Sequence, residues 1–238
     1  MSYQSVFKRY ELKYMITKEQ KKSVIESILP HMALDKYGRT TIRNIYFDTD
    51  SYLLIRRSIE KPAYKEKLRI RSYKRTNSDS QIFVELKKKY DSIVYKRRIS
   101  LPESDAISWI CNGKPCKKNN QISREINYFM EYYSPLHPKV FLSYEREAFY
   151  ARDGSDFRVT FDENILFREE ELSLGADVWG TPVLDEKLCL MELKCSGGIP
   201  LWMTGILSKE HIYKTSFSKY GSAYCNNIFH KLKEDNNV

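Results

Sequence analysis

The stretch YKEKLRIRSY, residues 64–73, decides how the rest of the chain is interpreted. Successive side chains of a β-strand point to opposite faces, so the alternation here predicts a strand with one cationic face and one mixed face. A single strand of this kind is commonly the solvent-exposed side of an ordinary sheet. The pattern gains weight because at least six other predicted strands also carry charged residues two positions apart. The cationic face of this stretch holds Lys65, Lys67, Arg69 and Arg71.

The remaining strands are predicted from the same alternation and from their content of aromatic and β-branched residues. The link between the strands at 64–73 and 81–90 is the polar turn TNSDS, which indicates an antiparallel meander that continues to residue 101. The other predicted strands cover residues 7–16, 40–48, 94–101, 139–150, 157–164 and 188–195.

Helices are predicted where apolar residues recur every three or four positions. Thr17 and Gln20 form a capping-box pattern at the start of the first helix, and Ser218 is the predicted N-cap of the last one. Asp50 is the predicted cap of a short helix that passes through residues 52–54. The longer helices are predicted over residues 17–28, 104–111, 121–133, 200–207 and 218–232.

Eight mostly antiparallel strands predict an α+β fold, in which an eight-stranded antiparallel β-barrel is covered outside by helices, since closure removes the sheet edges. Two orientations of the charged faces are open from the pattern alone. Outward-facing charges would be solvated, whereas inward-facing charges would form a cationic tunnel. The inward orientation is favoured because the charged faces contain single acids among the basic residues, the opposite faces are apolar enough to need covering, and amphipathic helices are present to cover them.

The composition points to a polyanionic partner. The chain has 238 residues, with 40 Lys+Arg, 31 Asp+Glu and a net charge of +9. The length fits a single domain over residues 1–238, and the positive surplus favours an anionic ligand. The five cysteines are odd in number and contain no CxxC pair, so we expect reduced thiols and a cytoplasmic protein. No signal peptide and no run of about 18 apolar residues is present, so no membrane span is predicted.

An inward cationic face would need a particular ligand. Two like charges about 6 Å apart repel by roughly 3 kcal/mol at an effective dielectric constant of about 20. Several inward cations would therefore destabilise an empty barrel, and a threaded polyanion would relieve the repulsion. Arg binds phosphate oxygens with a bidentate fork and Lys supplies a point charge. A narrow cationic tunnel thus predicts a triphosphate or longer phosphate chain, whereas nucleic acid suits an open groove with stacking aromatic side chains.

Nine segments, in this order, resemble the VTC domain, the polyphosphate polymerase branch of the triphosphate tunnel metalloenzyme (CYTH-like) superfamily. The resemblance covers roughly residues 7–229, and as an ordered set the segments are specific. The resemblance implies an eight-stranded antiparallel barrel with a cationic tunnel. The segments are FKRYELKYMI, IRNIYFDT, KLRIRSY, FVELKKKY, YKRRISL, LSYEREAFY, FRVTFDENI, LMELKCSGGIPLW and SFSKYGSAY.

The resemblance further implies transfer of the ATP γ-phosphate to a growing polyphosphate chain, with ATP and polyphosphate or triphosphate as partners and no nucleic acid. Glu192, together with Glu85, is the implied ligand of a divalent metal, Mn²⁺ or Mg²⁺. The implied catalytic residues, which hold the phosphates, are Arg69, Arg71, Lys87, Arg146, Arg158 and Lys219. The implied substrate-binding residues are Lys13, Lys96, Arg98, Lys194, Ser218 and Tyr144.

One departure from the superfamily pattern favours the polymerase branch. The hydrolase and cyclase branch carries a Glu-x-Glu-x-Lys pattern, and this chain has Arg9, Glu11 and Lys13 at those positions. The arginine removes a metal ligand and favours one metal over two. A metal-dependent triphosphatase of the same fold stays open as an alternative, in which Glu85 or Glu11 would activate the water.

Two further functions and two further pairings also stay open. A non-catalytic polyphosphate-binding module would keep the cations, and a nucleic-acid-binding basic protein would show affinity that falls steeply with salt. Glu85 could form a cross-strand salt bridge with Lys87 instead of binding metal. Asp162 could pair with Arg158 or Arg146.

Overall fold

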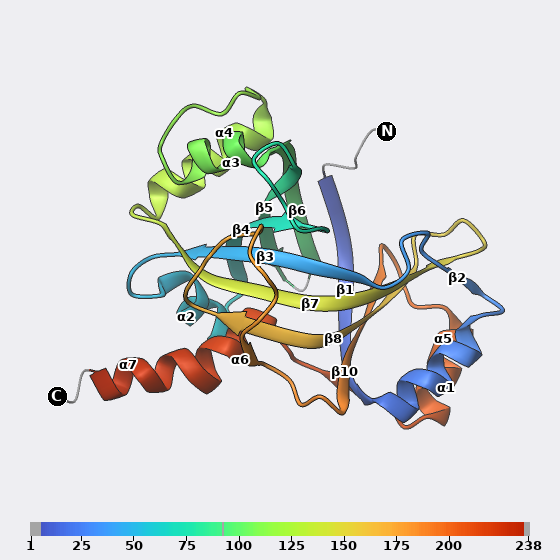
Figure 1. Cartoon of the computed structure of the whole chain (residues 1–238). Coiled ribbons are helices and arrows are strands. Elements are labelled where there is room, and N and C mark those ends of the chain that lie inside the picture. The colour runs from blue at the N-terminus through green and yellow to red at the C-terminus, as the bar shows by residue number, and fades with distance from the viewer. Residues whose placement is uncertain (1–5, 92, 236–238) are drawn as a thin grey trace.

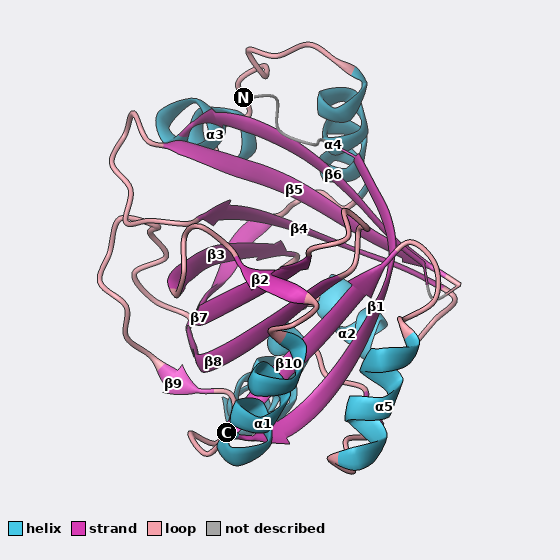
Figure 2. Cartoon of the chain, turned by 90° about the vertical axis from the view of Figure 1, so that its right-hand side faces the viewer, coloured by secondary structure: helices cyan, strands magenta, loops and turns pink. Residues whose placement is uncertain are grey.

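Eight antiparallel strands close into a ring around the interior of the molecule (Figures 1 and 2). The computed structural model describes residues 6–91 and 93–235. The strands are β1 (Val6–Thr17), β3 (Thr40–Asp48), β4 (Tyr64–Ser72), β5 (Gln81–Tyr90), β6 (Ile93–Pro102), β7 (His137–Ala151), β8 (Arg158–Arg168) and β10 (Leu188–Cys195). Their order is β7, β3, β4, β5, β6, β1, β10 and β8, and pairing of β8 with β7 closes the ring.

The ring consists of the eight predicted strands, so the predicted antiparallel sheet is confirmed. Three short strands extend it, and none of them was predicted. They are β2 (Met32–Leu34) beside β7, β9 (Thr181–Pro182) beside β8, and β11 (Lys214–Thr215) beside β1. With two or three residues each, these strands are too short to display an alternation that sequence reasoning could detect.

The helices are α1 (Lys18–Ile28), α2 (Leu53–Ile59), α3 (Glu103–Ile110), α4 (Gln121–Tyr132), α5 (Leu201–Lys209), α6 (Lys219–Ala223) and α7 (Phe229–Asp235), with a π-helical turn, η1 (Tyr224–Ile228), between the last two. The predicted capping box is present, because Thr17 and Gln20 exchange hydrogen bonds between side chain and backbone. Ser218 caps α6, since its hydroxyl accepts the Gly221 N–H. None of the described helices has the length and apolarity needed to span a bilayer.

The start of α2 differs from the prediction. Asp50 does not cap the helix, because its exposed carboxylate accepts a hydrogen bond from Lys139 Nζ at 2.8 Å. The fully buried Asp48 does so instead: its Oδ1 accepts the Leu54 N–H at 2.8 Å and its Oδ2 the Ile55 N–H at 3.0 Å. Asp48 ends β3 beneath the first turn of the helix, so its carboxylate reaches backbone donors that have no partner within the helix itself.

Helices cover the apolar outer faces of the ring. Trp109 of α3 and Phe129 of α4 pack in one cluster with Val84 of β5 and Ile99 of β6. A second cluster joins α1 and α5 to the outer faces of β1, β8 and β10. In Figure 1 these two helix pairs lie at opposite sides of the strands. Because the apolar faces point outward under helices, the charged faces point into the ring.

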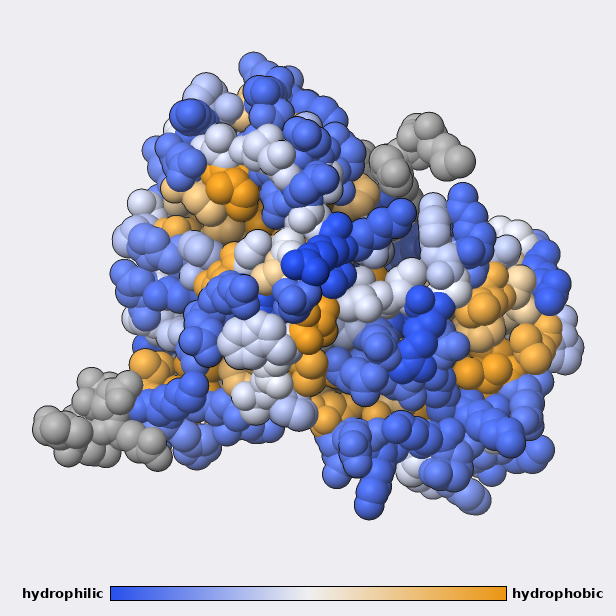
Figure 3. Space-filling model, in the orientation of Figure 1, coloured by the Kyte–Doolittle hydropathy of each residue, from blue (hydrophilic) through white to orange (hydrophobic). Residues whose placement is uncertain are grey.

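A third apolar cluster occupies part of the interior at the end of the ring near α2 and α6. Tyr144 of β7 and Leu190 of β10 pack there with Tyr220 of α6 and Ile228 of η1. The rest of the interior is left to charged side chains. On the face shown in Figure 3, hydrophilic residues cover most of the outer surface, and hydrophobic residues gather in separate patches.

Candidate functional site

A cavity of about 1550 Å³ lies inside the ring. Eighteen of its lining residues are Lys or Arg, whereas the acidic ones are Glu11, Asp35 and Glu192. The cavity extends along the whole of β4 and β5, from Lys65 and Lys89 at one end to Phe83 and Tyr73 at the other. Since like charges in a partly buried space are poorly screened, such an interior suits an anionic ligand.

Lysines lie directly opposite lysines across neighbouring strands of this cavity. Lys65 of β4 faces Lys89 of β5, Lys67 faces Lys87, and Lys87 faces Lys96 of β6. Like charges directly opposite each other in an antiparallel pair destabilise a sheet. An anion that runs along this row of lysines would convert the repulsion into attraction.

Glu85 lies beneath the arginines of β4 and is fully buried. Arg69 Nη2 lies 2.7 Å from its Oε2, Lys96 Nζ 3.2 Å from its Oε1, and Arg71 Nη1 3.8 Å from its Oε2. The two guanidinium groups are held from their other sides as well. Arg69 donates to the Tyr46 hydroxyl at 2.8 Å, and Arg71 donates to Asn44 Oδ1 and the Tyr144 hydroxyl, each at 2.8 Å. Glu85 therefore acts as a buried counter-ion that fixes two arginines at the cavity wall.

Two further carboxylates, Glu192 of β10 and Asp162 of β8, organise a second cationic cluster. Arg146 donates to both oxygens of Asp162 at 2.6 Å. Lys219 Nζ lies 2.5 Å from Asp162 Oδ2 and 3.5 Å from Glu192 Oε1. Lys194 Nζ lies 2.8 Å from Glu192 Oε2, and Arg146 Nη2 lies 3.3 Å from the same oxygen. Of the two pairings that the sequence left open for Asp162, the structure contains the one with Arg146.

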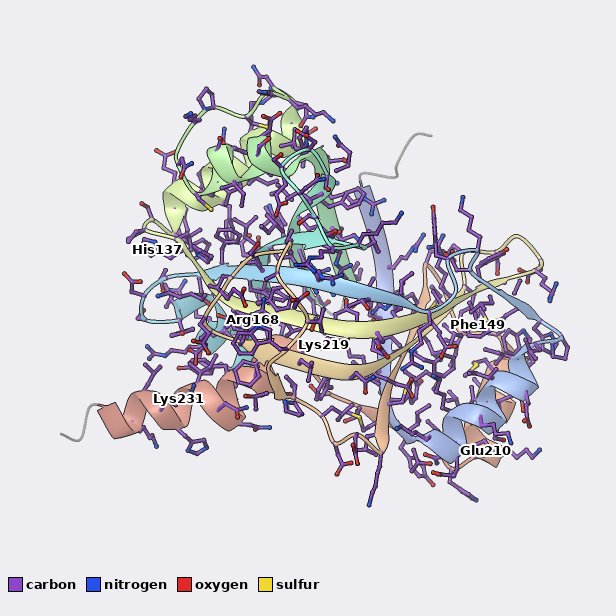
Figure 4. All side chains as sticks on the ribbon, viewed as in Figure 1. His137, Phe149, Arg168, Glu210, Lys219 and Lys231 are labelled. Carbon is purple, nitrogen blue, oxygen red and sulfur yellow. The ribbon has the colours of Figure 1, made fainter. Side chains whose placement is uncertain are left out.

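The segment before α6 forms one wall of the cavity. The Phe217 carbonyl accepts a hydrogen bond from Lys13 Nζ at 2.6 Å, and the Ser218 hydroxyl accepts one from Lys67 Nζ at 3.2 Å. Tyr220 donates its hydroxyl to Asp48 at 3.1 Å, which ties α6 to the start of α2. Figure 4 shows Lys219 near the centre of the molecule, whereas Glu210 and Lys231 lie at its periphery.

Several lysines of the cavity have lowered pKa values, whereas at Lys219 burial is outweighed by the carboxylates of Asp162 and Glu192, which raise its pKa. Burial, followed by the charges of Lys13, Lys65 and Lys87, lowers the pKa of Lys67 to about 7. Burial also dominates at Lys96 and lowers its pKa to about 7, even though the Glu85 carboxylate acts in the opposite direction. The amino groups of Lys67 and Lys96 are therefore partly neutral near pH 7, and they can take up protons when an anion binds.

In three acids of this region, the charges of nearby cations outweigh the effect of burial on the pKa. Burial alone would raise the pKa of Glu192, but the charges of Lys194, Lys219, Lys13 and Arg146 hold that pKa well below its usual range. Glu85 shows the same balance of burial against three cations, and its pKa is also held well below the usual range. For Glu11, burial is outweighed chiefly by Lys87, 2.7 Å away, and the pKa falls to about 2. All three carboxylates are therefore ionised at neutral pH.

A family model described as the VTC domain matches residues 8–227. The chain belongs to the VTC domain family. The resemblance inferred from the sequence is thereby confirmed, while no curated protein matches the chain.

Two solved structures share the fold of this VTC domain. A proposed adenylate cyclase from Bacillus halodurans is 15% identical, with coverage of 90% of this chain and 96% of that chain and a TM-score of 0.57. A proposed adenylyl cyclase from Hippeastrum, described as having a dominant triphosphatase activity, is 12% identical, with coverage of 94% and 96% and a TM-score of 0.56. At these identities the likeness concerns the fold.

The structure brings all but one of the predicted site residues of the VTC domain to the lining of one cavity. They come from seven strands of the ring and from the start of α6. Arg158 is exposed and lies towards one end, whereas Arg71 and Lys219 are buried. The residues are Lys13, Arg69, Arg71, Lys87, Lys96, Arg98, Tyr144, Arg146, Arg158, Glu192, Lys194, Ser218 and Lys219.

Glu85 is the exception. It lies behind the wall, with both carboxylate oxygens within salt-bridge distance of cations. The structure also differs from the alternative pairing with Lys87, because Lys87 Nζ binds Glu11 Oε2 at 2.7 Å. The register explains this, since Glu85 lies opposite Arg69 on one side and Arg98 on the other. Because Glu85 is fully buried and is not part of the cavity lining, a metal that entered with phosphate would not reach it, whereas it would reach Glu192.

Several side chains of the cavity were not among the predicted site residues. Lys67 lies on the same alternating face as Arg69 and Arg71, so its position was visible in the pattern. Asn44 and Tyr46, which hold the two guanidinium groups, carry no charge signal, and only the register of β3 with β4 reveals their role.

The residues that could hold a divalent metal are few. No group of three or more His, Cys, Asp and Glu able to hold a metal occurs in the part of the chain that the structure describes. Glu192 and Glu11 are cavity-lining carboxylates whose charges act on each other. Mg²⁺ and similar cations commonly take one or two carboxylates and complete their shell with water and substrate phosphates. The donor set therefore fits a cation that arrives with phosphate and contacts Glu192.

Proposed function

We propose that this VTC domain is a polyphosphate polymerase, which transfers the γ-phosphate of ATP to a polyphosphate chain held in the cavity. The observation that carries the proposal is the cationic lining, which continues along the whole inward face of β4 and its neighbours. A compact site for one triphosphate would not need the row of opposed lysines beyond Arg69. Membership of the VTC domain family supports a polyphosphate-related activity.

The proposed reaction needs positioning and charge neutralisation more than proton transfer. An oxygen of the terminal phosphate of the chain attacks the γ-phosphorus in line. The bond from the γ-phosphorus to the β,γ-bridging oxygen breaks, and ADP leaves with that electron pair. The acceptor is already an anion, so no general base is required. Arg146, Lys194 and Lys219 would bind the reacting phosphates and hold them in line.

A divalent cation, when bound, would neutralise phosphate oxygens. Glu192 is the protein group that would hold it. Arg146, Lys194 and Lys219 around Glu192 keep this carboxylate ionised and fix its position at the cavity wall. The particular metal, Mn²⁺ or Mg²⁺, is part of the proposal.

A triphosphatase is the second candidate, because the Hippeastrum relative is described as having that activity. Hydrolysis would require a carboxylate that accepts a proton from water near neutral pH. The pKa of Glu11 is about 2, and Glu85 is buried with its pKa held low by three cations. Neither carboxylate is suited to act as the base, which favours transfer to an anionic acceptor.

The test is a reaction of the full chain with ATP, Mn²⁺ or Mg²⁺ and a short polyphosphate primer, analysed on a gel stained for polyphosphate. Long chains should form, and Glu192→Gln should abolish them. Glu186→Gln, in an exposed turn, is the matched control and should leave the product unchanged. Phosphate release without chain growth would instead establish a triphosphatase. If neither occurs but polyphosphate raises the melting temperature, the domain is a binding module.

A further inference from the structure

The two ends of the cavity differ in chemistry. Along the inward face of β4 the residues change from Lys65 and Lys67 to Arg69 and Arg71, and Tyr73 follows where the strand ends. The neighbouring strand β5 runs in the opposite direction and shows the opposite order: Phe83 comes first, and Lys87 and Lys89 come last. Along these two strands, aromatic residues therefore lie at one end of the cavity and lysines at the other.

The aromatic mouth is formed by Tyr37, Tyr73, Phe83 and Arg98. Tyr73 is 42% exposed and stands edge-on to Phe83, with ring centroids 5.8 Å apart. The Arg98 guanidinium lies 4.7 Å from the Phe83 ring centroid. Tyr37, in the loop before β3, is 66% exposed. This mouth presents flat, accessible ring surface beside cationic groups.

The lysine mouth is formed by Lys61, Lys65, Lys89 and Lys214, together with Ser58 and Ser222. Tyr10 of β1, which pairs with Ile93 of β6, also lines the cavity near this end and is 40% exposed. Tyr10 belongs to the alternating face opposite that of the inward Glu11 and Lys13, whereas Tyr73 continues the inward face of β4. Tyr220 is 2% exposed, because it packs on Tyr46 and donates its hydroxyl to Asp48. Lysine ammonium groups and serine hydroxyls can follow a phosphate chain, but they offer no surface for a base.

A nucleoside triphosphate is asymmetric in the same way as the cavity, since it carries a flat base at one end and phosphates at the other. Bases stack on aromatic side chains, whereas phosphates pair with Lys and Arg. We propose that the nucleoside of the substrate stacks on Tyr73 at the aromatic mouth, and that the phosphate chain leaves through the lysine mouth. This inference rests on the proposed function and assigns a direction to it.

The first part of the proposal, that the nucleoside stacks on Tyr73, predicts that Tyr73→Ala loses affinity for ATP but not for tripolyphosphate. Binding of ATP should weaken roughly five- to 150-fold, which corresponds to about 1–3 kcal/mol for one base stack. Binding of inorganic tripolyphosphate should change less than twofold. Both affinities are measured by isothermal titration calorimetry on the full chain. Tyr73→Phe should bind ATP as the unmodified protein does, and Tyr90→Ala, an exposed tyrosine outside the cavity lining, is the control.

The second part of the proposal, that the phosphate chain leaves through the lysine mouth, predicts a different defect in the double variant Lys65→Ala with Lys89→Ala. It should bind ATP within twofold of the unmodified protein but release shorter polyphosphate chains on a gel. The proposal is overturned if Tyr73→Ala weakens ATP and tripolyphosphate equally or weakens neither, or if the lysine variant loses ATP affinity and keeps its chain length. Because the calorimetric test requires no turnover, the nucleoside site can be supported even if the proposed polymerase activity fails, and refuted even if that activity is found.

Discussion

Removing the charge of Glu85 tests whether the arginines at the cavity wall depend on a buried counter-ion. In Glu85→Gln the volume is nearly unchanged, while Arg69, Arg71 and Lys96 lose the carboxylate that lies 2.7 to 3.8 Å from them. Breaking a buried ion pair by removing one partner costs about 3–5 kcal/mol. Lys96, whose pKa is about 7, can give up its proton and relieve part of the repulsion. We therefore expect a loss near the lower limit, about 3 kcal/mol.

The assay is thermal unfolding followed by circular dichroism. For a domain of this size, 1 kcal/mol corresponds to roughly 2–4 °C, so Tm should fall by about 6–12 °C. Glu145→Gln is the matched control, because its side chain is 36% exposed and pairs with Arg39 at the surface. Such a surface pair contributes about 0–1 kcal/mol. Tripolyphosphate should raise the Tm of Glu85→Gln more than that of the control, since it returns negative charge to the same arginines.

The result that refutes this reasoning is a Tm for Glu85→Gln no lower than that of Glu145→Gln. The same experiment also tests the metal role first inferred for Glu85 from the sequence. If Glu85 were a metal ligand, its replacement would leave the metal-free protein as stable as before, and would remove only the stabilisation added by Mn²⁺ or Mg²⁺.

Two other predictions concern proton uptake and the junction of α2 with α6. Since the pKa of Lys67 is about 7 and a bound anion raises it, tripolyphosphate binding at pH 8 should take up protons and weaken between pH 7 and 9. Calorimetry in buffers of different ionisation enthalpy measures this, and a heat that is the same in all buffers contradicts it. Asp48→Ala should lose about 2 kcal/mol by urea denaturation, because it removes a helix cap and the acceptor for Tyr220. Asp50→Ala, the exposed control, should lose less than about 0.5 kcal/mol, and equal losses would refute the assignment of the cap.

The strands of the ring were predictable because each is long enough to show its alternation. The residues that cap the ends of helices were harder to predict. Asp48 and Asp50 are the same residue type two positions apart, and only burial beneath the first turn of α2 makes Asp48 the cap. The partners of Glu85 required the register of three strands. Its sequence neighbour Lys87 shares its face, but Glu11, from a distant strand, takes that lysine.

Arginine and lysine side chains in the cavity have different kinds of partner, which follows from their acid–base chemistry. Arginine cannot shed its proton in a protein, so a buried guanidinium needs permanent partners. Arg69 has Glu85 and Tyr46, and Arg146 has Asp162. Lysine can shed its proton when buried, so Lys67 is tolerated with the Ser218 hydroxyl as its described hydrogen-bond partner and a pKa of about 7.

Arginines therefore hold a fixed geometry in the empty protein, while Lys67 and Lys96, with pKa values of about 7, gain protons when a phosphate enters. In an interior built this way the repulsion among cations is smallest when the cavity is empty, and the attraction is greatest when a polyanion fills it. A chain of phosphates that is extended one unit at a time presents a changing amount of negative charge. Groups that can gain and lose protons, as Lys67 and Lys96 can, match that changing charge better than permanently charged guanidinium groups.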